Sequence, residues 1–160
     1  MEITKYVGPA PARYGRFGTA LPEGFSVLHV TEFLRQLVAD KRLFLKKKLD
    51  VKATYHDPCN LARFTYVVDP PRKLLTALAG ENFVEMEWHG RKAHTCGGCG
   101  GVPFTYPDLS AKAAQIRMEQ VLRTGAKILA SADPGCEQML SRAGQRIEVK
   151  NFVELIAEAI

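Results

Sequence analysis

The chain has 160 residues, 46% of them hydrophobic, and a formal net charge of +5. This length suffices for one hydrophobic core, and the short apolar runs, broken by Lys, Glu or Gly, exclude a transmembrane helix. Residues 1–5 do not begin a secretory signal, and the basic runs at 46–48 and 91–92 lack interleaved aromatic residues. We therefore expect a cytoplasmic protein that neither binds nucleic acid nor inserts into a membrane.

In chain order, the sequence predicts an irregular arm followed by alternating strands and helices. Residues 1–24, rich in Gly and Pro, indicate the arm or linker, which leaves 25–160 as a single domain. Apolar runs of strand type lie at 26–30, 51–56, 83–88, 128–131 and 147–149. Helical patterns follow them at 31–38, 70–78, 108–124, 134–140 and 152–160.

Capping residues support several of these helices. Thr31 and Asn151 are suited to cap the first and last helices, and Asp108 or Ser110 the longest one, which Gly125 would end. Five strand–helix units predict an α/β fold with a mostly parallel, Rossmann-like sheet. In such a fold the loops after the strands meet at one edge, where open α/β proteins bind ligands.

The four cysteines all lie in predicted loops. Cys96 and Cys99 belong to the glycine-rich segment 94–101, which we expect at the top of the third strand, while Cys59 and Cys136 follow other strands. Glycines let the backbone approach a bound group closely, and clustered cysteines in an intracellular chain more often bind metal or do redox work than form disulfides. The sequence thus predicts a thiolate site assembled from three loops.

Three motifs around these thiols resemble the cysteine-rich "CCG" domain of the heterodisulfide reductases and their glycolate-oxidase and lactate-utilisation iron–sulfur relatives. Residues 55–63 (YHDPCNLAR) resemble the first family motif, 95–101 (TCGGCGG) the middle one and 133–136 (DPGC) the last. The gaps between them, 35 residues from Cys59 to Thr95 and 36 from Cys96 to Asp133, also fit. The resemblance runs from about Phe25 to the C-terminus.

The resemblance implies an iron–sulfur electron-transfer domain of a heterodisulfide-reductase-like or hydroxy-acid-oxidising complex. The implied ligands are Cys59, Cys96 and Cys136, with Cys99 and Asp133 as further candidates, and the implied cofactor is a [4Fe–4S] cluster. Thr95 and Asp133 replace two family cysteines, so we expect a simpler cluster than the five-thiol noncubane one. Relatives that oxidise lactate or glycolate often carry Asp at the Asp133 position.

Other interpretations of the same residues stay open at this point. Three thiolates with a fourth donor also suit zinc, which would make the domain a structural interaction module, and Cys96 with Cys99 could serve as a thiol–disulfide pair. Asp133 could instead cap the helix that follows it. His56 and His94 could donate to a metal or be ordinary loop residues, and Arg63 and Arg72 could bind an anion or simply be solvated. All of these positions are read from the sequence alone.

Relatives of this kind usually carry two such domains in tandem, so the chain resembles one half of that arrangement. We therefore expect partners among other subunits of a redox complex, including a second domain of this type or a ferredoxin-like protein. The apolar residues Val102, Phe104 and Tyr106 follow the glycine loop between or beside prolines. Because those prolines stiffen the backbone, we expect the aromatic rings to stay partly uncovered as a docking surface.

Overall fold

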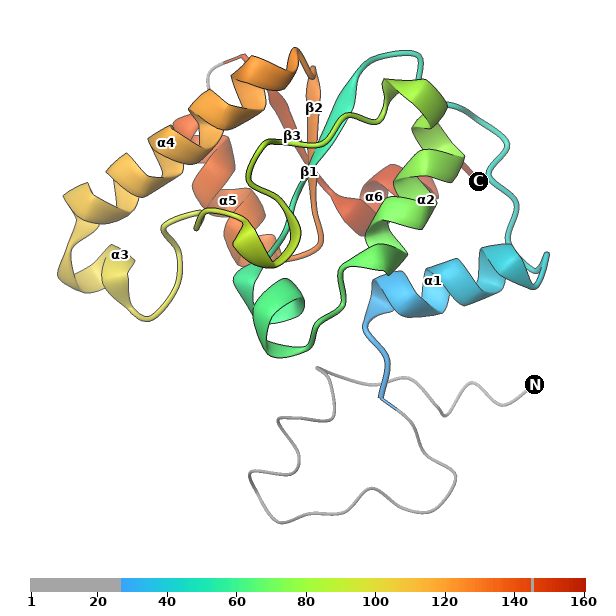
Figure 1. Ribbon diagram of the computed structural model, residues 1–160, viewed down its shortest axis with the longest axis horizontal. Coiled ribbons are helices and arrows are strands. Elements are labelled where there is room, and N and C mark those ends of the chain that lie inside the picture. The colour runs from blue at the N-terminus through green and yellow to red at the C-terminus, as the bar shows by residue number, and fades with distance from the viewer. Residues whose placement is uncertain (1–26, 145) are drawn as a thin grey trace.

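A computed structural model describes residues 27–144 and 146–160. The predicted arm at 1–24 lies outside the described residues. Within them, the sheet has three parallel strands in the order β1-β2-β3, formed by Ala53–His56, Ile128–Ser131 and Glu148–Asn151. Ala53 pairs with Ile128 and Ile128 with Glu148, so the carboxyl ends of all three parallel strands lie at the same edge of the sheet (Figure 1). The predicted α/β class with a parallel sheet is confirmed.

Six α-helices and three short helices of other types surround the sheet in the described part of the chain. The α-helices are α1 (Val30–Ala39), α2 (Asp69–Ala79), α3 (Val102–Thr105), α4 (Pro107–Thr124), α5 (Pro134–Ala143) and α6 (Phe152–Ala157). The short ones are the π-helix η3 (Asn60–Phe64) and the 3₁₀ helices η4 (Gly80–Asn82) and η5 (Gly90–Lys92).

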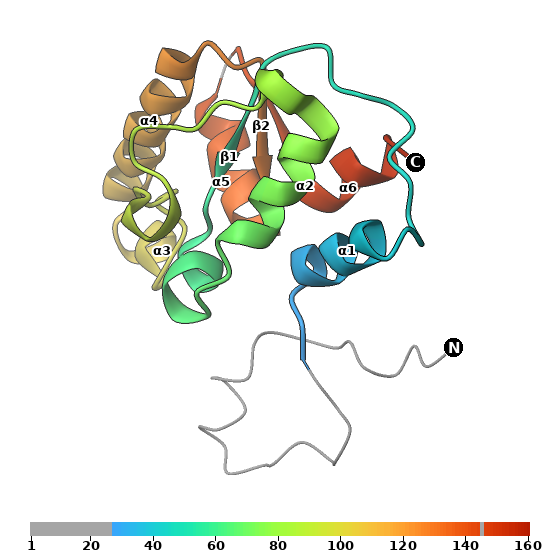
Figure 2. The same cartoon turned by 45° about the vertical axis from the view of Figure 1, so that its right-hand side comes forward.

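The sheet lies between two helical layers, and strand alternation decides which side chains meet which layer. Tyr55 and its neighbours on one face pack against α2 and α6, and Leu129 on the other face packs against α4 and α5. Figures 1 and 2 show α2 and α6 on one side of the strands and α4 with α5 on the other. His56 follows Tyr55 by one position, so it faces the α4 layer, which also holds Cys96 and Cys136.

Two predicted strands are wrong. The 26–30 run contains Ser26, outside the described residues, and its remainder leads directly into α1, because His29 caps that helix. The His29 ring accepts the Thr31 N–H at 3.3 Å, and the Glu32 carboxylate accepts the His29 N–H at 2.8 Å, forming a capping box. Thr31, predicted as the cap, lies buried in the first helical turn.

The 83–88 segment touches the sheet only at its start. Phe83 forms one isolated bridge to Ala53, and beyond it Arg72 holds the Glu85 carboxylate at 2.6 Å while Met86 enters the core on the α4 side. The acidic alternation therefore reflects a segment that leaves the sheet edge. As a result, the glycine-rich segment does not top a strand but follows η5 in a loop.

Three of the predicted helix ends are confirmed. Gly125 ends α4 with φ of +73°, Pro134 opens α5, and Asn151 caps α6 by accepting the Val153 N–H at 3.0 Å. Helix α4 begins at Pro107, just before the predicted caps. No helix in the described residues is both long and apolar enough to cross a membrane.

Candidate metal centre

The first cysteine loop is held by a buried ion pair. Strand β1 ends at His56 and continues through Asp57 and Pro58 to Cys59, which precedes η3. The Asp57 carboxylate, 2% exposed, accepts both Nη atoms of Arg72 at 2.7 and 2.8 Å and the Gly90 N–H at 2.7 Å. This bidentate pair fixes the backbone two residues before the Cys59 thiol.

The glycine loop is clamped against the start of α4. Ser110 donates its hydroxyl to the Gly97 carbonyl at 2.8 Å, and the Gly97 N–H donates to the Thr95 hydroxyl at 3.0 Å. Gly97 has φ of +84°, and a Cβ there would stand 2.3 Å from the Ser110 carbonyl oxygen. Only glycine allows this approach, which places Cys96 against the core.

The last cysteine lies in the first turn of α5, which directly follows β2. Asp133 caps this helix by accepting the Cys136 N–H at 2.9 Å, as one of the two sequence interpretations of Asp133 held. The side chains of Thr95 and Asp133 thus both bind backbone N–H groups, at the positions where the family motif has cysteine.

These loops place the four sulfurs in two contact pairs, each of which joins two loops. The Cys59 and Cys99 sulfurs lie 2.8 Å apart, and those of Cys96 and Cys136 lie 3.3 Å apart. All four cysteines are free, the first pair half-buried and the second buried. A ring nitrogen of His56 and the sulfurs of Cys96 and Cys136 all lie within 4.8 Å of one another, the tightest potential ligand group in the described residues.

Proton sharing makes the two pairs electrostatically unequal. Hydrogen bonding with Cys136 lowers the pKa of the Cys96 thiol to about 4, with further help from His56 and from the Gly98 N–H, 3.4 Å from the Cys96 sulfur. The same contact raises the pKa of Cys136, so one proton serves both sulfurs. Burial and the neighbouring Cys59 raise the pKa of Cys99 to about 12. In the structure Cys96 Sγ donates to Cys136 Sγ, so the pair shares one proton and neither sulfur alone is the thiolate.

A buried polar network that the cysteine motifs do not reveal lies behind Cys96. Arg117 of α4 is 0% exposed, and its Nε donates to His56 Nδ1 at 3.0 Å. Its Nη1 donates to the Trp88 carbonyl at 2.7 Å and to Gln120 Oε1 at 2.6 Å. The Gln120 amide in turn donates to His94 Nδ1 at 2.7 Å, and His94 stacks on Trp88 with ring centroids 5.2 Å apart.

One sequence signal could have found Arg117. It follows Ala114 by three residues and precedes Val121 by four, which puts a charged residue on the buried stripe of α4. Charged side chains are almost never fully buried without a partner, so an arginine in this position indicates a polar site beneath the helix.

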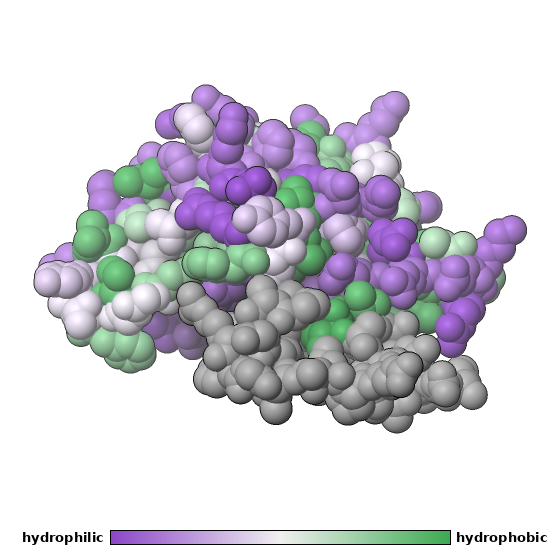
Figure 3. Space-filling view, turned by 60° about the horizontal axis from the view of Figure 1, so that its bottom comes forward, coloured by the Kyte–Doolittle hydropathy of each residue, from purple (hydrophilic) through white to green (hydrophobic). Residues whose placement is uncertain are grey.

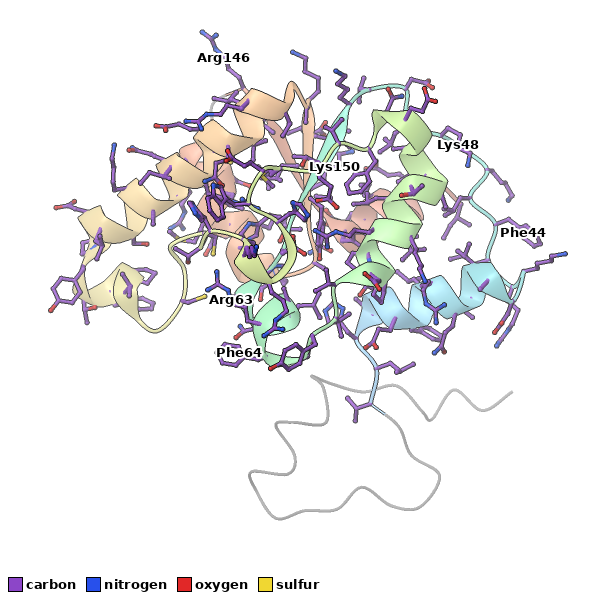
Figure 4. The ribbon with its side chains drawn as sticks, in the orientation of Figure 1. Phe44, Lys48, Arg63, Phe64, Arg146 and Lys150 are labelled. Atoms are coloured by element: carbon purple, nitrogen blue, oxygen red, sulfur yellow. The ribbon has the colours of Figure 1, made fainter. Side chains whose placement is uncertain are left out.

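Arg63 and Arg72, which the sequence left as either anion ligands or solvated side chains, both have structural partners. Arg63 of η3 donates through Nε to the Arg91 carbonyl at 3.2 Å and through Nη2 to the Ala93 carbonyl, which ties η3 to the segment leading to the glycine loop. Figure 4 shows Arg63 and the neighbouring Phe64 on η3 at the lower edge of the ribbon. Arg72 is occupied by Asp57 and Glu85.

Exposed aromatic residues lie beside the glycine loop. Phe104 is 92% exposed and Tyr106 65% exposed, and both belong to the short segment between that loop and α4. Figure 3 shows hydrophobic residues gathered over α3 and the neighbouring part of α4. Both rings are therefore exposed, as the flanking prolines predicted, and their role as a docking surface stays a prediction.

Comparisons with known proteins find a matching family model and several relatives. The family model for the cysteine-rich domain CCG matches residues 53–141. The chain is 39% identical over 147 residues to one subunit of the dihydromethanophenazine:CoB–CoM heterodisulfide reductase of Methanosarcina acetivorans, covering 89% of this chain and 36% of that protein. It is 32% identical over 168 residues to the probable iron-sulfur-binding oxidoreductase FadF of Bacillus subtilis, covering 99% and 24%.

A third relative is one subunit of the fumarate reductase (CoM/CoB) of Methanothermobacter marburgensis, 30% identical over 148 residues, covering 89% of this chain and 28% of that protein. The chain therefore spans only about a quarter to a third of the length of these relatives.

Proposed function

Because this chain belongs to the cysteine-rich CCG domain family, we propose that it is an iron–sulfur redox domain whose cluster is held by Cys59, Cys96, Cys99 and Cys136. The observation that carries the proposal is the meeting of four sulfurs from three separate loops in two contact pairs, at 2.8 and 3.3 Å. Nothing in ordinary core packing requires four free thiols at one edge of a sheet.

The chemistry of the donor set fits such a cluster. Four thiolates are the usual ligands of [2Fe–2S] and [4Fe–4S] clusters, and the bound cluster would supply one-electron transfer. Thiolates and an anionic cluster carry negative charge, which the buried guanidinium of Arg117 would offset. The Gly98 N–H beside Cys96 adds a backbone donor to the same sulfur.

We include Asp133 as a candidate fifth ligand. Its Oδ1 accepts the Cys136 N–H, and the second carboxylate oxygen is the group that would bind iron. Asp133→Asn keeps an efficient helix cap but removes the carboxylate charge, whereas Asp133→Ala removes both. Cluster loss in both variants supports ligation, and loss in the Ala variant alone supports capping only.

The relatives support a role as part of a larger electron-transfer complex. Two of them are named as subunits, of heterodisulfide reductase and of fumarate reductase, and FadF is named as an oxidoreductase. We propose that this domain passes electrons within a heterodisulfide-reductase-like or hydroxy-acid-oxidising complex. Its partner would be a second cysteine-rich domain or a ferredoxin-like iron–sulfur protein.

One observation favours a second candidate, a structural zinc site. A single tetrahedral zinc with Zn–S bonds near 2.3 Å places its sulfurs about 3.8 Å apart. The sulfurs within each pair lie closer to that separation than to the wider span of a multi-iron cluster. In this case the metal would only join the three loops.

Anaerobic purification followed by iron, sulfide and zinc analysis separates the two candidates. An iron–sulfur domain gives iron and acid-labile sulfide with a broad visible absorption that bleaches on reduction. Zinc at one atom per chain, without sulfide even after anaerobic reconstitution with iron and sulfide, would refute the redox proposal. Serine variants of the four cysteines should each lower the iron content.

A further inference from the structure

We propose that His56 acts as a fixed N–H donor to the Cys96 sulfur and not as a metal ligand, and that Arg117 is the positioning residue that holds it in this role. The inference rests on the proposed function only in that Cys96 binds the cofactor. The hydrogen bonds of Arg117 and His56 are present in the chain without any bound cofactor.

The direction of one hydrogen bond decides the tautomer of His56. Arginine Nε always carries a hydrogen, so its contact with His56 Nδ1 at 3.0 Å requires an unprotonated Nδ1 with its lone pair directed at Arg117. A doubly protonated ring would place two N–H groups against each other. The remaining proton of a neutral imidazole must then lie on Nε2.

Burial supports the neutral ring. His56 is 1% exposed, and desolvation lowers its pKa. Tyr55, on the other face of β1, cannot reach Nε2. Nε2 makes no other hydrogen bond among the described residues, and a ring nitrogen of His56 lies within 4.8 Å of the Cys96 and Cys136 sulfurs, so the Cys96 sulfur is the acceptor within reach of the Nε2 hydrogen.

The donor and acceptor nitrogens of His56 are the reverse of those in a metal-binding histidine. A ligating histidine donates its second N–H to a carboxylate or carbonyl, which leaves a lone pair for the metal. Here the second nitrogen accepts from a cation, so Nε2 keeps its hydrogen and has no lone pair to offer. The compact group of His56, Cys96 and Cys136 is therefore two sulfurs and a donor, although its spacing resembles a three-ligand site.

Arg117 is suited to hold this arrangement because it is anchored on two further acceptors. Its Nη1 binds the Trp88 carbonyl and Gln120 Oε1, so the guanidinium plane is fixed before it meets His56. The same anchoring orients Gln120 to donate to His94, whose Nδ1 is likewise an acceptor. Arg117 thus fixes, directly or through Gln120, which ring nitrogen is the acceptor in two histidines near the cysteine loop.

The first test is nitrogen NMR on the wild-type, reduced, metal-free chain, which needs no variant to fold. With ¹⁵N-labelled protein, and His56 assigned by comparison with His56→Gln, we expect the signature of a neutral ring with hydrogen on Nε2. A ring with hydrogen on Nδ1, or on both nitrogens, at neutral pH overturns the proposal.

The second test uses Co²⁺ alone as a probe of the ligand set, under anaerobic conditions. We expect wild type, His56→Gln and the control His89→Gln to give the same visible ligand-field pattern. The His89 ring hydrogen-bonds to the Met86 carbonyl at 2.7 Å, and it is not a member of the network of Arg117, His56, Gln120 and His94. A change of that pattern in His56→Gln alone would show nitrogen ligation and overturn the proposal.

The third test compares His56→Leu with His56→Gln, because glutamine can still donate an N–H and leucine cannot. We follow the ultraviolet thiolate absorbance of the metal-free chain as a function of pH and assign the Cys96 step by comparison with Cys96→Ser. Leucine should raise the midpoint of that step by about one to two pH units, the range for a hydrogen bond to a charged group, while glutamine should leave it nearly unchanged. Equal shifts in both variants would contradict the donor role.

Arg117→Lys completes the set, since it keeps the charge but removes the Nε donor. We expect the variant to lose the fixed Nε2–H signature of His56 even when its circular dichroism shows a folded chain. An unchanged tautomer in a folded Arg117→Lys chain would refute the positioning role. A chain that binds no iron but shows the expected tautomer would refute the proposed function alone.

Discussion

Replacing Gly97 by alanine tests whether the close approach of the glycine loop to α4 builds the cysteine site. The matched control is Gly100→Ala in the same loop. Both glycines have positive φ, +84° and +67°, but a Cβ at Gly100 has nothing within 4 Å while one at Gly97 meets the Ser110 carbonyl oxygen at 2.3 Å. The pair of variants separates backbone strain from steric overlap.

The expected magnitudes follow from these two terms. The left-handed backbone costs a non-glycine residue about 1 kcal/mol, which is all that Gly100→Ala should lose. Overpacking against backbone that cannot rotate away adds about 2 kcal/mol at Gly97. With about 2–4 °C per kcal/mol for a domain of this size, Tm should fall about 2–4 °C for Gly100→Ala and about 6–12 °C for Gly97→Ala.

The assay is thermal unfolding of the metal-free chain, followed by anaerobic reconstitution. Because Cys96 immediately precedes Gly97, the loop that moves to relieve the overlap carries the Cys96 sulfur away from Cys136, and Gly97→Ala should also lose bound iron. Equal Tm losses in the two variants would refute the reasoning, since the Ser110 contact would then contribute nothing.

Three further predictions concern the ion pair, the pH dependence and the aromatic surface. Asp57→Ala removes the buried carboxylate that accepts from Arg72 and from the Gly90 N–H, and leaves Glu85 to pair the guanidinium. It should lower the unfolding free energy by about 2–3 kcal/mol in denaturant titration, against about 1 kcal/mol or less for Glu85→Ala at the more exposed side of the same arginine. Because burial lowers the pKa of His56, the unfolded chain takes up that proton first as pH falls below about 6.5. The contribution of the neutral His56 to the unfolding free energy is therefore fully present above pH 6.5 and is lost below it at about 1.4 kcal/mol per pH unit. In urea unfolding, His56→Gln should reduce the dependence of the unfolding free energy on pH in this range. Replacing Phe104 and Tyr106 together by serine should change the unfolding free energy by no more than about 0.5 kcal/mol but weaken self-association, or association with a subunit of the proposed complex, in sedimentation. A large loss of stability would show that the rings belong to the core.

Local sequence rules predicted the elements whose ends have strong chemical signals. Pro134 with Asp133, Asn151 and Gly125 each define a helix end through a backbone bond that the residue type favours, and the structure contains each one. The buried strands β1 and β2 were also predictable, because apolar, strand-favouring residues followed by Asp-Pro have few alternatives.

The 26–30 strand fails because of a local capping box at His29, whereas the other failures come from contacts distant in sequence. The 83–88 segment has the alternation of a strand, but Arg72 draws Glu85 away from the sheet edge, and no local pattern contains that interaction. The pairing of Cys59 with Cys99 depends on the path of the loop between them. Motif reasoning names residues around the cysteines, whereas Arg117 reaches His56 from 61 positions away.

The spacing of the sulfur pairs has a consequence for how the unfolded chain meets its metal. Cys59 and Cys99 are 40 positions apart, as are Cys96 and Cys136, so the pairs define two consecutive loops that share only the short 96–99 segment. Closing each loop in a random chain costs about 3 kcal/mol of entropy from the length-dependent part alone. If the metal binds the unfolded chain, the free energy of its bonds to sulfur is reduced by the closure entropy of both loops. A metal that binds after folding meets neither cost, because the sheet and the Asp57 and Ser110 clamps have already brought the ends together. The folded domain should therefore bind the metal more tightly than the unfolded chain does, and metal binding should stabilise the fold by the same difference in free energy.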